Sequence, residues 1–140
     1  MEIDLTIYLI ARIREKANRF LTRELKSRGL GRLAPSHGDL MLALFQHRQL
    51  TMKALAELID RDKSTVTALV GKLVVLGFVQ KRTDPIDSRI TLVSLTDEGA
   101  SLKADFKDIS RRLYEKIFRG VSDPERKALS TLLAKINENL

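Results

Sequence analysis

The chain contains no cysteine, which excludes disulfide bonds, thiolate metal sites and thiol-based redox sensing. Its only two histidines are His37 and His47, and we expect both to be partly exposed surface side chains rather than metal ligands. No uncharged run exceeds eight residues, whereas a helix that spans a bilayer needs about 20 apolar residues. The chain also lacks a nucleophile–base pair, a glycine-rich phosphate loop and a metal-ligand cluster, so we expect no enzyme activity, no metal and no cofactor.

The N-terminus carries Glu2 and Asp4 instead of a cationic leader, so we expect no signal peptide, no membrane contact and a cytoplasmic location. The formal net charge is +7, and a basic balance favours polyanions, of which nucleic acid is the commonest. The excess is spread along the chain: +4 over 1–35, +2 over 36–95 and +1 over 96–140. The net charge therefore does not locate a binding site for a polyanion, and the positions of individual cations are the better guide.

Hydrophobic periodicity predicts a mainly helical protein with one small β-hairpin, in the order α-α-α-α-β-β-α-α. The predicted helices cover 4–28, 36–48, 51–59, 62–76, 96–118 and 122–140, and the predicted strands cover 78–82 and 90–95. We expect Ser36 and Thr51 to be N-caps, Gly77 to end a helix, and Ser122 and Glu125 to form a capping box. The second helix is so apolar that we place it at the centre of the core.

The predicted helix 62–76 has an apolar face and a face of small hydroxyl and cationic side chains. The apolar residues are Val66, Leu69, Val70 and Leu73, and the other face carries Lys63, Ser64, Thr67 and Lys72. Such a polar face fits the major groove of DNA without steric conflict. The hairpin that follows places Lys81, Arg82 and Arg89 around an Asp84-Pro85 turn, so a positively charged hairpin lies beside the helix.

These segments resemble a MarR-type winged helix-turn-helix regulator over about 45 residues. The matching motifs are Leu55-Ala56-Glu57-Leu58, Asp62-Lys63-Ser64-Thr65-Val66-Thr67, Leu69-Val70, Lys72-Leu73, Gly77-Phe78-Val79, Arg82, Asp84-Pro85-Ile86-Asp87-Ser88-Arg89, Leu92 and Leu95-Thr96-Asp97-Glu98-Gly99. The resemblance implies one MarR-type domain over 1–140. Its winged helix-turn-helix head would cover 36–95, and the dimerisation helices would cover 1–35 and 96–140.

The resemblance further implies a homodimer that binds double-stranded DNA at an inverted-repeat, pseudo-palindromic operator and usually represses transcription. Many members release DNA when a small phenolic or anionic effector enters a crevice between the dimer arm and the head. The alternative is a winged-helix protein–protein interaction module that never binds DNA. In that alternative the wing arginines would be dispensable for function.

The predicted DNA-binding residues lie on the reading helix and the wing. They are Lys63, Ser64, Thr65, Thr67, Lys72, Arg82 and Arg89. The hydroxyls can meet base edges or phosphates, and a helix N-terminus also favours phosphate, although Ser64 and Thr65 could instead only satisfy amides at the helix start. By the resemblance, Arg89 reaches the minor groove, where negative potential is concentrated. Asp87 is expected to hold the wing or Arg89 in position.

Five residues are candidates to line the effector crevice, with packing in the core as the alternative: Tyr8, Arg12, His37, Met41 and Phe45. The chain also departs from the family pattern, because uncharged residues replace longer polar or charged ones that are frequent in other members. These residues are Ala68, Gly71, Val74, Val75 and Ile86. We expect fewer phosphate contacts and a shallower salt dependence of DNA binding, by about 0.9 log units per lost contact.

Overall fold

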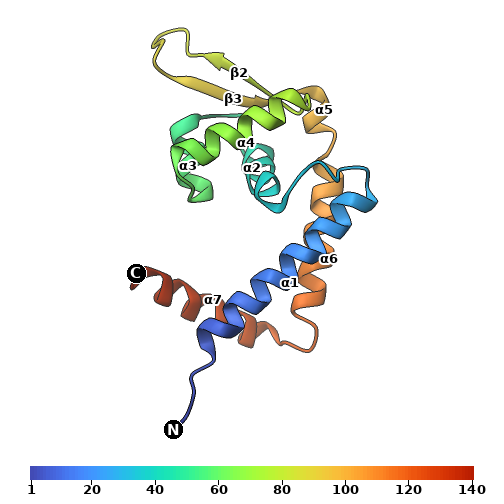
Figure 1. The fold of residues 1–140 in the computed structure, drawn as a ribbon, viewed down its shortest axis with the longest axis vertical. Coiled ribbons are helices and arrows are strands. Elements are labelled where there is room, and N and C mark those ends of the chain that lie inside the picture. The colour runs from blue at the N-terminus through green and yellow to red at the C-terminus, as the bar shows by residue number, and fades with distance from the viewer.

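A computed structural model describes residues 1–140, which form a mainly helical fold with one small sheet (Figure 1). In chain order the elements are α1 (Thr6–Ser27), α2 (Pro35–Gln46), β1 (Gln49–Thr51), α3 (Met52–Ile59), α4 (Lys63–Val75), β2 (Val79–Thr83), β3 (Thr91–Leu95), α5 (Asp97–Ala100), α6 (Lys103–Ile117) and α7 (Asp123–Glu138). This architecture confirms the predicted fold class. The predicted element order was incomplete, because β1 and the separation of α5 from α6 were not foreseen.

The sheet has three antiparallel strands in the order β1-β3-β2. Val79 pairs with Leu95 and Thr83 with Thr91, so β2 and β3 form the hairpin that the sequence predicted. The third strand, β1, pairs with the other edge of β3, with Leu50 opposite Val93. Three residues carry too little pattern to be recognised as a strand, and β1 exists because β3 supplies its hydrogen-bonding partner.

The predicted helix 96–118 is wrong at its start, because a four-residue helix, α5, precedes α6. Thr96 fixes this corner: its hydroxyl donates to the carbonyl of Gly77 and accepts from the N–H of Gly99 at 3.1 Å. Gly99 is buried against the residue that precedes β2, and a Cβ there would lie 1.9 Å from the carbonyl oxygen of Phe78. The corner then turns the chain away from the sheet and into α6.

Helix starts follow the predicted capping at two sites and differ at a third. Thr51 Oγ1 accepts from the N–H of Ala54 at 3.0 Å, and Ser122 with Glu125 forms the predicted reciprocal capping box. The helix α2 begins one residue earlier than expected, with Pro35 in its first turn and Ala34, not Ser36, as its N-cap residue. Proline fits this position because it has no N–H to leave unsatisfied and its φ is already helical.

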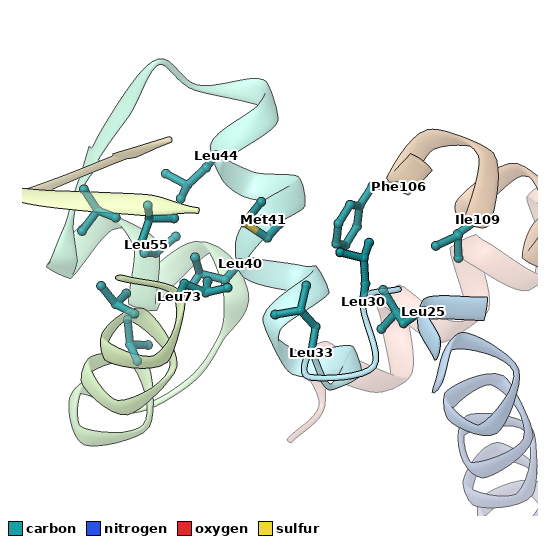
Figure 2. Close-up of a cluster of buried hydrophobic side chains, with 14 residues drawn as sticks. Leu25, Leu30, Leu33, Leu40, Met41, Leu44, Leu55, Leu73, Phe106 and Ile109 are labelled. Carbon is teal, nitrogen blue, oxygen red and sulfur yellow. The ribbon is translucent and has the colours of Figure 1, made fainter. Parts of the chain in front are cut away.

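One hydrophobic core runs from the sheet to the junction of α1 and α6 (Figure 2). Leu40 and Met41 of α2 are fully buried at its centre, which confirms the central position predicted for this helix. Leu25 of α1 and Phe106 of α6 belong to the same cluster. The long helices and the winged part therefore share buried surface and are held in a fixed relation.

An ion-pair network joins α1 to α6 beside this core. Arg28, at the end of α1, is only 18% exposed and pairs with Asp105 at 3.0 Å and also with Asp108. Arg112 pairs with Glu24 at 2.7 Å. Hydrogen bonds from Arg28, and then from Arg111, lower the pKa of Asp108 to about 2.

Both ends of the chain expose apolar side chains at helical spacing. The helix α7 has no buried residue at all, and in Figure 1 it crosses the N-terminal half of α1, apart from the winged part. Its exposed apolar residues are Leu129, Leu132, Leu133 and Ile136, and those near the N-terminus are Ile3, Leu5, Ile7, Tyr8, Leu9, Ile10 and Ile13. Within the protomer α7 is held by its capping turn and by Arg126, whose guanidinium lies 4.2 Å from the ring centroid of Phe118. None of the helices combines the length and the apolar character needed to cross a membrane.

Candidate nucleic-acid interface

The helices α3 and α4 form a helix-turn-helix. Asp60 ends α3 in the left-handed conformation, with a φ of 52°, which aspartate tolerates better than most residues. Asp62 then starts α4, whose Val66, Val70 and Leu73 are at most 1% exposed. The opposite face of α4 is exposed, and the helix lies next to the hairpin of β2 and β3 (Figure 1).

A hydrogen-bond network fixes the hydroxyls at the start of α4. The Asp62 carboxylate accepts the N–H of Thr65 at 2.7 Å and the hydroxyl of Ser64 at 3.0 Å, and the Thr67 hydroxyl donates to the carbonyl of Lys63 at 2.8 Å. The hydrogen bonds from Thr65, and then that from Ser64, lower the pKa of Asp62, so the cap is ionised near neutral pH. The Asp62 carboxylate therefore satisfies one amide of this helix start by itself, and a phosphate contact at the N-terminus of α4 stays a prediction.

The tip of the hairpin is built by a second aspartate, Asp84. Its Oδ1 accepts the N–H groups of Ile86 at 2.8 Å and of Asp87 at 3.0 Å, while its own N–H donates to the carbonyl of Ile90. This side-chain-to-backbone turn holds the tip in one shape without further packing. Ile86 is left 95% exposed at the tip.

Asp87 and Arg89 form a pair within the wing. The Asp87 carboxylate accepts the Arg89 backbone N–H at 3.0 Å, its Nε at 3.1 Å and its Nη2 at 3.2 Å. Hydrogen bonds from the Arg89 side chain, and then from its backbone, lower the pKa of Asp87. The Arg89 side chain is nevertheless 89% exposed. The carboxylate therefore orients a guanidinium that is open to a ligand.

The other predicted cations lie on both sides of α4. Lys63 is exposed at the first turn of the helix, and Lys72 is exposed in its last turn. Arg82 lies on the outer part of β2, where its Nη2 donates to Gln49 Oε1 of β1 at 3.1 Å. The unpredicted strand β1 thus supplies a partner that positions Arg82, and nothing in the local pattern around Gln49 indicated this.

The expectation that His37 is partly exposed is wrong, whereas His47 is exposed. His37 is 6% exposed, and its Nδ1 accepts the N–H of Ala34 at 2.9 Å, which satisfies an amide at the start of α2. Burial, and then the charge of Lys72, lower the pKa of His37. No three acidic or histidine side chains are grouped as a metal site.

The five residues proposed for the effector crevice do not meet in one cavity of the protomer. Met41 is fully buried, and Phe45 packs against Phe106 with ring centroids 5.5 Å apart, so both are core residues. Tyr8 is exposed on the first turn of α1. Arg12 instead lines a groove between α1 and α6. The prediction is corrected for Met41 and for His37, because a buried side chain cannot contact a ligand in the crevice.

A cavity of about 470 Å³ does lie between α1 and the helix-turn-helix. Its polar lining comes from three separate parts of the chain: Arg14, Asn18 and Thr22 of α1, Ser36 and Asp39 of α2, and Arg61 of the turn before α4. The sequence alone does not indicate this set, because its members become neighbours only when α1 packs beside α2. The single local signal was the run of cations on the polar face of α1.

The comparisons with known proteins agree with this geometry. The family model described as MarR family matches residues 33–91. The chain is 30% identical over 108 residues to the HTH-type transcriptional regulator YdgJ of Bacillus subtilis, covering 77% of this chain and 66% of that protein. It is 29% identical over 100 residues to the organic hydroperoxide resistance transcriptional regulator of Bacillus subtilis, covering 70% of this chain and 68% of that protein. The chain thus spans about two thirds of the length of these relatives.

Among solved structures, Staphylococcus aureus MepR in complex with DNA matches with a TM-score of 0.89 and 22% identity, covering 99% of this chain and 100% of that chain. The match includes the long helices as well as the winged part, so it extends over the whole fold. This structure shares both the winged part and the long helices α1, α6 and α7, and the family model and the curated relatives match the sequence motifs of the winged part. The chain belongs to the MarR family.

Proposed function

We propose that this protein is a sequence-specific, DNA-binding transcriptional regulator that acts as a homodimer on an inverted-repeat operator. Residues 36–95 form its DNA-binding head, and residues 1–35 and 96–140 form its dimerisation helices. The observation that carries the proposal is the pairing of an exposed polar face on α4 with an exposed guanidinium, Arg89, held by Asp87 in the adjacent wing. Both elements are fixed on one core, as a rigid reading surface requires.

On a duplex, the outer face of α4 enters the major groove, and the wing follows the backbone to the neighbouring minor groove. Arg89 suits the minor groove because its charge is exposed at the end of a narrow hairpin. Lys63, Lys72 and Arg82 flank α4 and the wing and contact phosphates, which fix the register of the head on the DNA.

A second copy of the chain is the proposed partner of the exposed apolar surface. The leucines of α7 recur at i, i+3 and i+4 and are about half exposed, so they form an amphipathic stripe with nothing to cover it in the protomer. The N-terminal stripe of α1 lies at the same end of the molecule as α7 (Figure 1). Pairing the two ends with those of another copy buries both stripes and sets two heads side by side.

The DNA-binding claim is tested by a gel shift of genomic fragments, including the DNA upstream of the protein's own gene. Arg89→Ala is compared with Arg32→Ala, which removes an exposed arginine from the loop between α1 and α2. We expect wild type and Arg32→Ala to shift the same fragment and Arg89→Ala to bind at least tenfold more weakly. Equal binding by all three proteins would favour the alternative, a protein–protein interaction module.

We also propose that the regulator responds to a small anionic or phenolic effector in the cavity between α1 and the helix-turn-helix. Arg14 comes from the arm and Arg61 from the turn just before α4. An anion bound between these two arginines would link the arm to the reading helix and change the spacing of the heads. Benzoate, as the simplest aromatic carboxylate, should weaken the gel shift of wild type but not of Arg61→Ala; an equal effect on both proteins would contradict this site.

A further inference from the structure

The outer face of α4 offers very few hydrogen-bond donors to a ligand. With Val66 and Val70 buried, helical geometry turns Ser64, Ala68 and Gly71 to the opposite side. None of the three has a long side chain, and a Cβ added at Gly71 would meet nothing within 4 Å. The edge of a base pair can therefore approach this helix closely without displacing any side chain.

Three hydroxyls lie at the start of α4: that of Thr65 is half-buried, and those of Ser64 and Thr67 have already used their hydrogen atoms. A hydroxyl has one hydrogen to donate and two lone pairs to accept with. Ser64 donates to the Asp62 carboxylate at 3.0 Å, and Thr67 donates to the Lys63 carbonyl at 2.8 Å. The bond to the ionised carboxylate is charge-assisted and is the harder of the two to break. What remains for DNA is a set of acceptor lone pairs together with the methyl groups of Ala68 and Thr67.

The lysines of α4 do not supply the missing donors at the centre of this face. Lys63 is the first residue of the helix and lies at the margin of the groove. Lys72 is exposed in the last turn of α4, on the flank of the helix rather than at the centre of this face. No arginine, asparagine or glutamine occurs between Lys63 and Val75. Guanine is most often recognised by a bidentate arginine or lysine at its N7 and O6, and this helix has no side chain placed for that contact.

We propose that the operator positions facing the centre of α4 are A·T pairs, recognised by hydroxyl acceptors and by methyl contacts; this inference rests on the proposed DNA-binding function. The Ser64 and Thr67 oxygens accept from the N6 amino group of adenine, and the methyls of Ala68 and Thr67 pack on the C5 methyl of thymine. Cytosine also offers an amino group, but it has no methyl, so the methyl contact separates the two pairs.

Selection of binding sites from a random duplex pool by the full chain tests the base preference. We expect an inverted repeat in which the major-groove positions protected by α4 are A·T. Enrichment of G·C at those positions would overturn this inference while leaving the DNA-binding function intact. A pool from which nothing is enriched, together with the absence of any gel shift, would overturn the proposed function and this inference with it.

Base analogues test the contacts one at a time in the selected site. Replacing thymine by uracil removes only the methyl, and we expect about a fourfold loss of affinity for each contacted thymine, the value for burying one methyl. Ala68→Gly should lose part of this sensitivity to the thymine methyl group.

Replacing adenine by purine in the same site removes the N6 amino group, and this should weaken the binding of wild type more than that of Ser64→Ala. A G·C substitution should recover only the methyl part of the affinity when its cytosine carries a 5-methyl group, because guanine presents O6 where adenine presents N6. Uracil binding as tightly as thymine would contradict the proposal.

Discussion

The α-carbon of Gly99 lies so close to the Phe78 carbonyl that a Cβ there would be 1.9 Å from the oxygen and 2.8 Å from the carbon. Phe78 precedes β2, and Gly99 lies in α5, just after β3, so this contact closes the base of the wing hairpin. The Thr96 hydroxyl bridges the same two segments by donating to Gly77 and accepting from Gly99. The glycine of the Leu-Thr-x-x-Gly motif is therefore required by close packing of backbone on backbone.

Gly99→Ala should destabilise the protein by about 3 kcal/mol, at the upper end of the usual cost of overpacking, because the atom it meets is backbone. Gly71→Ala is the matched control, since its Cβ would meet nothing within 4 Å in the interior of α4. That variant should gain about 0.5–1 kcal/mol of stability from its better helix propensity. Urea unfolding at one fixed protein concentration measures both changes, and equal stabilities of the two variants would refute the packing argument.

The link between α1 and α6 should weaken in acid. The pKa of Asp108 is lowered to about 2 in the folded protein by Arg28 and then Arg111, from 3.8 in the unfolded chain. A lowered carboxyl pKa stabilises the fold above the unfolded value, and this contribution is lost as the pH falls from about 4 to about 2. We expect Asp108→Asn to be less stable than wild type at pH 7 and to lose less stability over that range. Parallel pH profiles would show that the network contributes nothing.

His37 should make the fold sensitive to mild acid. Its pKa is lowered by burial and then by Lys72, so the folded protein favours the neutral ring that accepts the Ala34 N–H. The stabilisation is present at high pH and is lost as the pH falls below 6.5, the value in the unfolded chain. Thermal unfolding between pH 7.5 and 5 should show a smaller loss for His37→Gln than for wild type. His47→Gln, at the exposed histidine, is the control and should lose as much thermal stability over this pH range as wild type. If His37→Gln also loses as much as wild type, the role of the buried ring is refuted.

The apolar stripe of α7 should be needed for dimerisation and not for folding of the protomer. Leu132→Asp places a charge where 57% of the side chain is exposed in the protomer, so folding should be little affected. Light scattering should give a dimer for wild type and a monomer for Leu132→Asp, with similar helical circular dichroism. Ser130→Asp, elsewhere on the same helix, is the control and should stay dimeric. A monomeric wild type, or a dimeric Leu132→Asp, would contradict the proposed role of α7 as a dimerisation helix.

Much of the fold could be predicted because its helices carry their periodicity locally. The buried stripe of α4, the caps at Thr51 and Ser122, and the hairpin around Asp84 depend on residues within a few positions of one another. Capping and turn formation are local interactions, so their sequence signals were reliable. Asp87 and Arg89 are only two positions apart, so their pairing is also a local interaction that the sequence can indicate.

The features that the sequence does not indicate depend on contacts between distant segments. The strand β1 needs β3 as its partner, and α5 packs its Gly99 against the backbone of Phe78, on the other side of the hairpin. His37 is buried because its helix lies at the centre of the core. The cavity lined by Arg14 and Arg61 joins α1 to the turn before α4. No local pattern could indicate these relations, because they arise only when the elements pack together.

Hydroxyl-radical footprinting of the full chain on a selected site tests the central claim most directly. If two heads of one dimer each place α4 in a major groove, the protected patches lie on one face of the duplex with centres about 10 base pairs apart. Arg89→Ala should then lose protection at the minor-groove positions outside each patch. A single protected patch in a complex that contains only one copy of the chain would contradict the account.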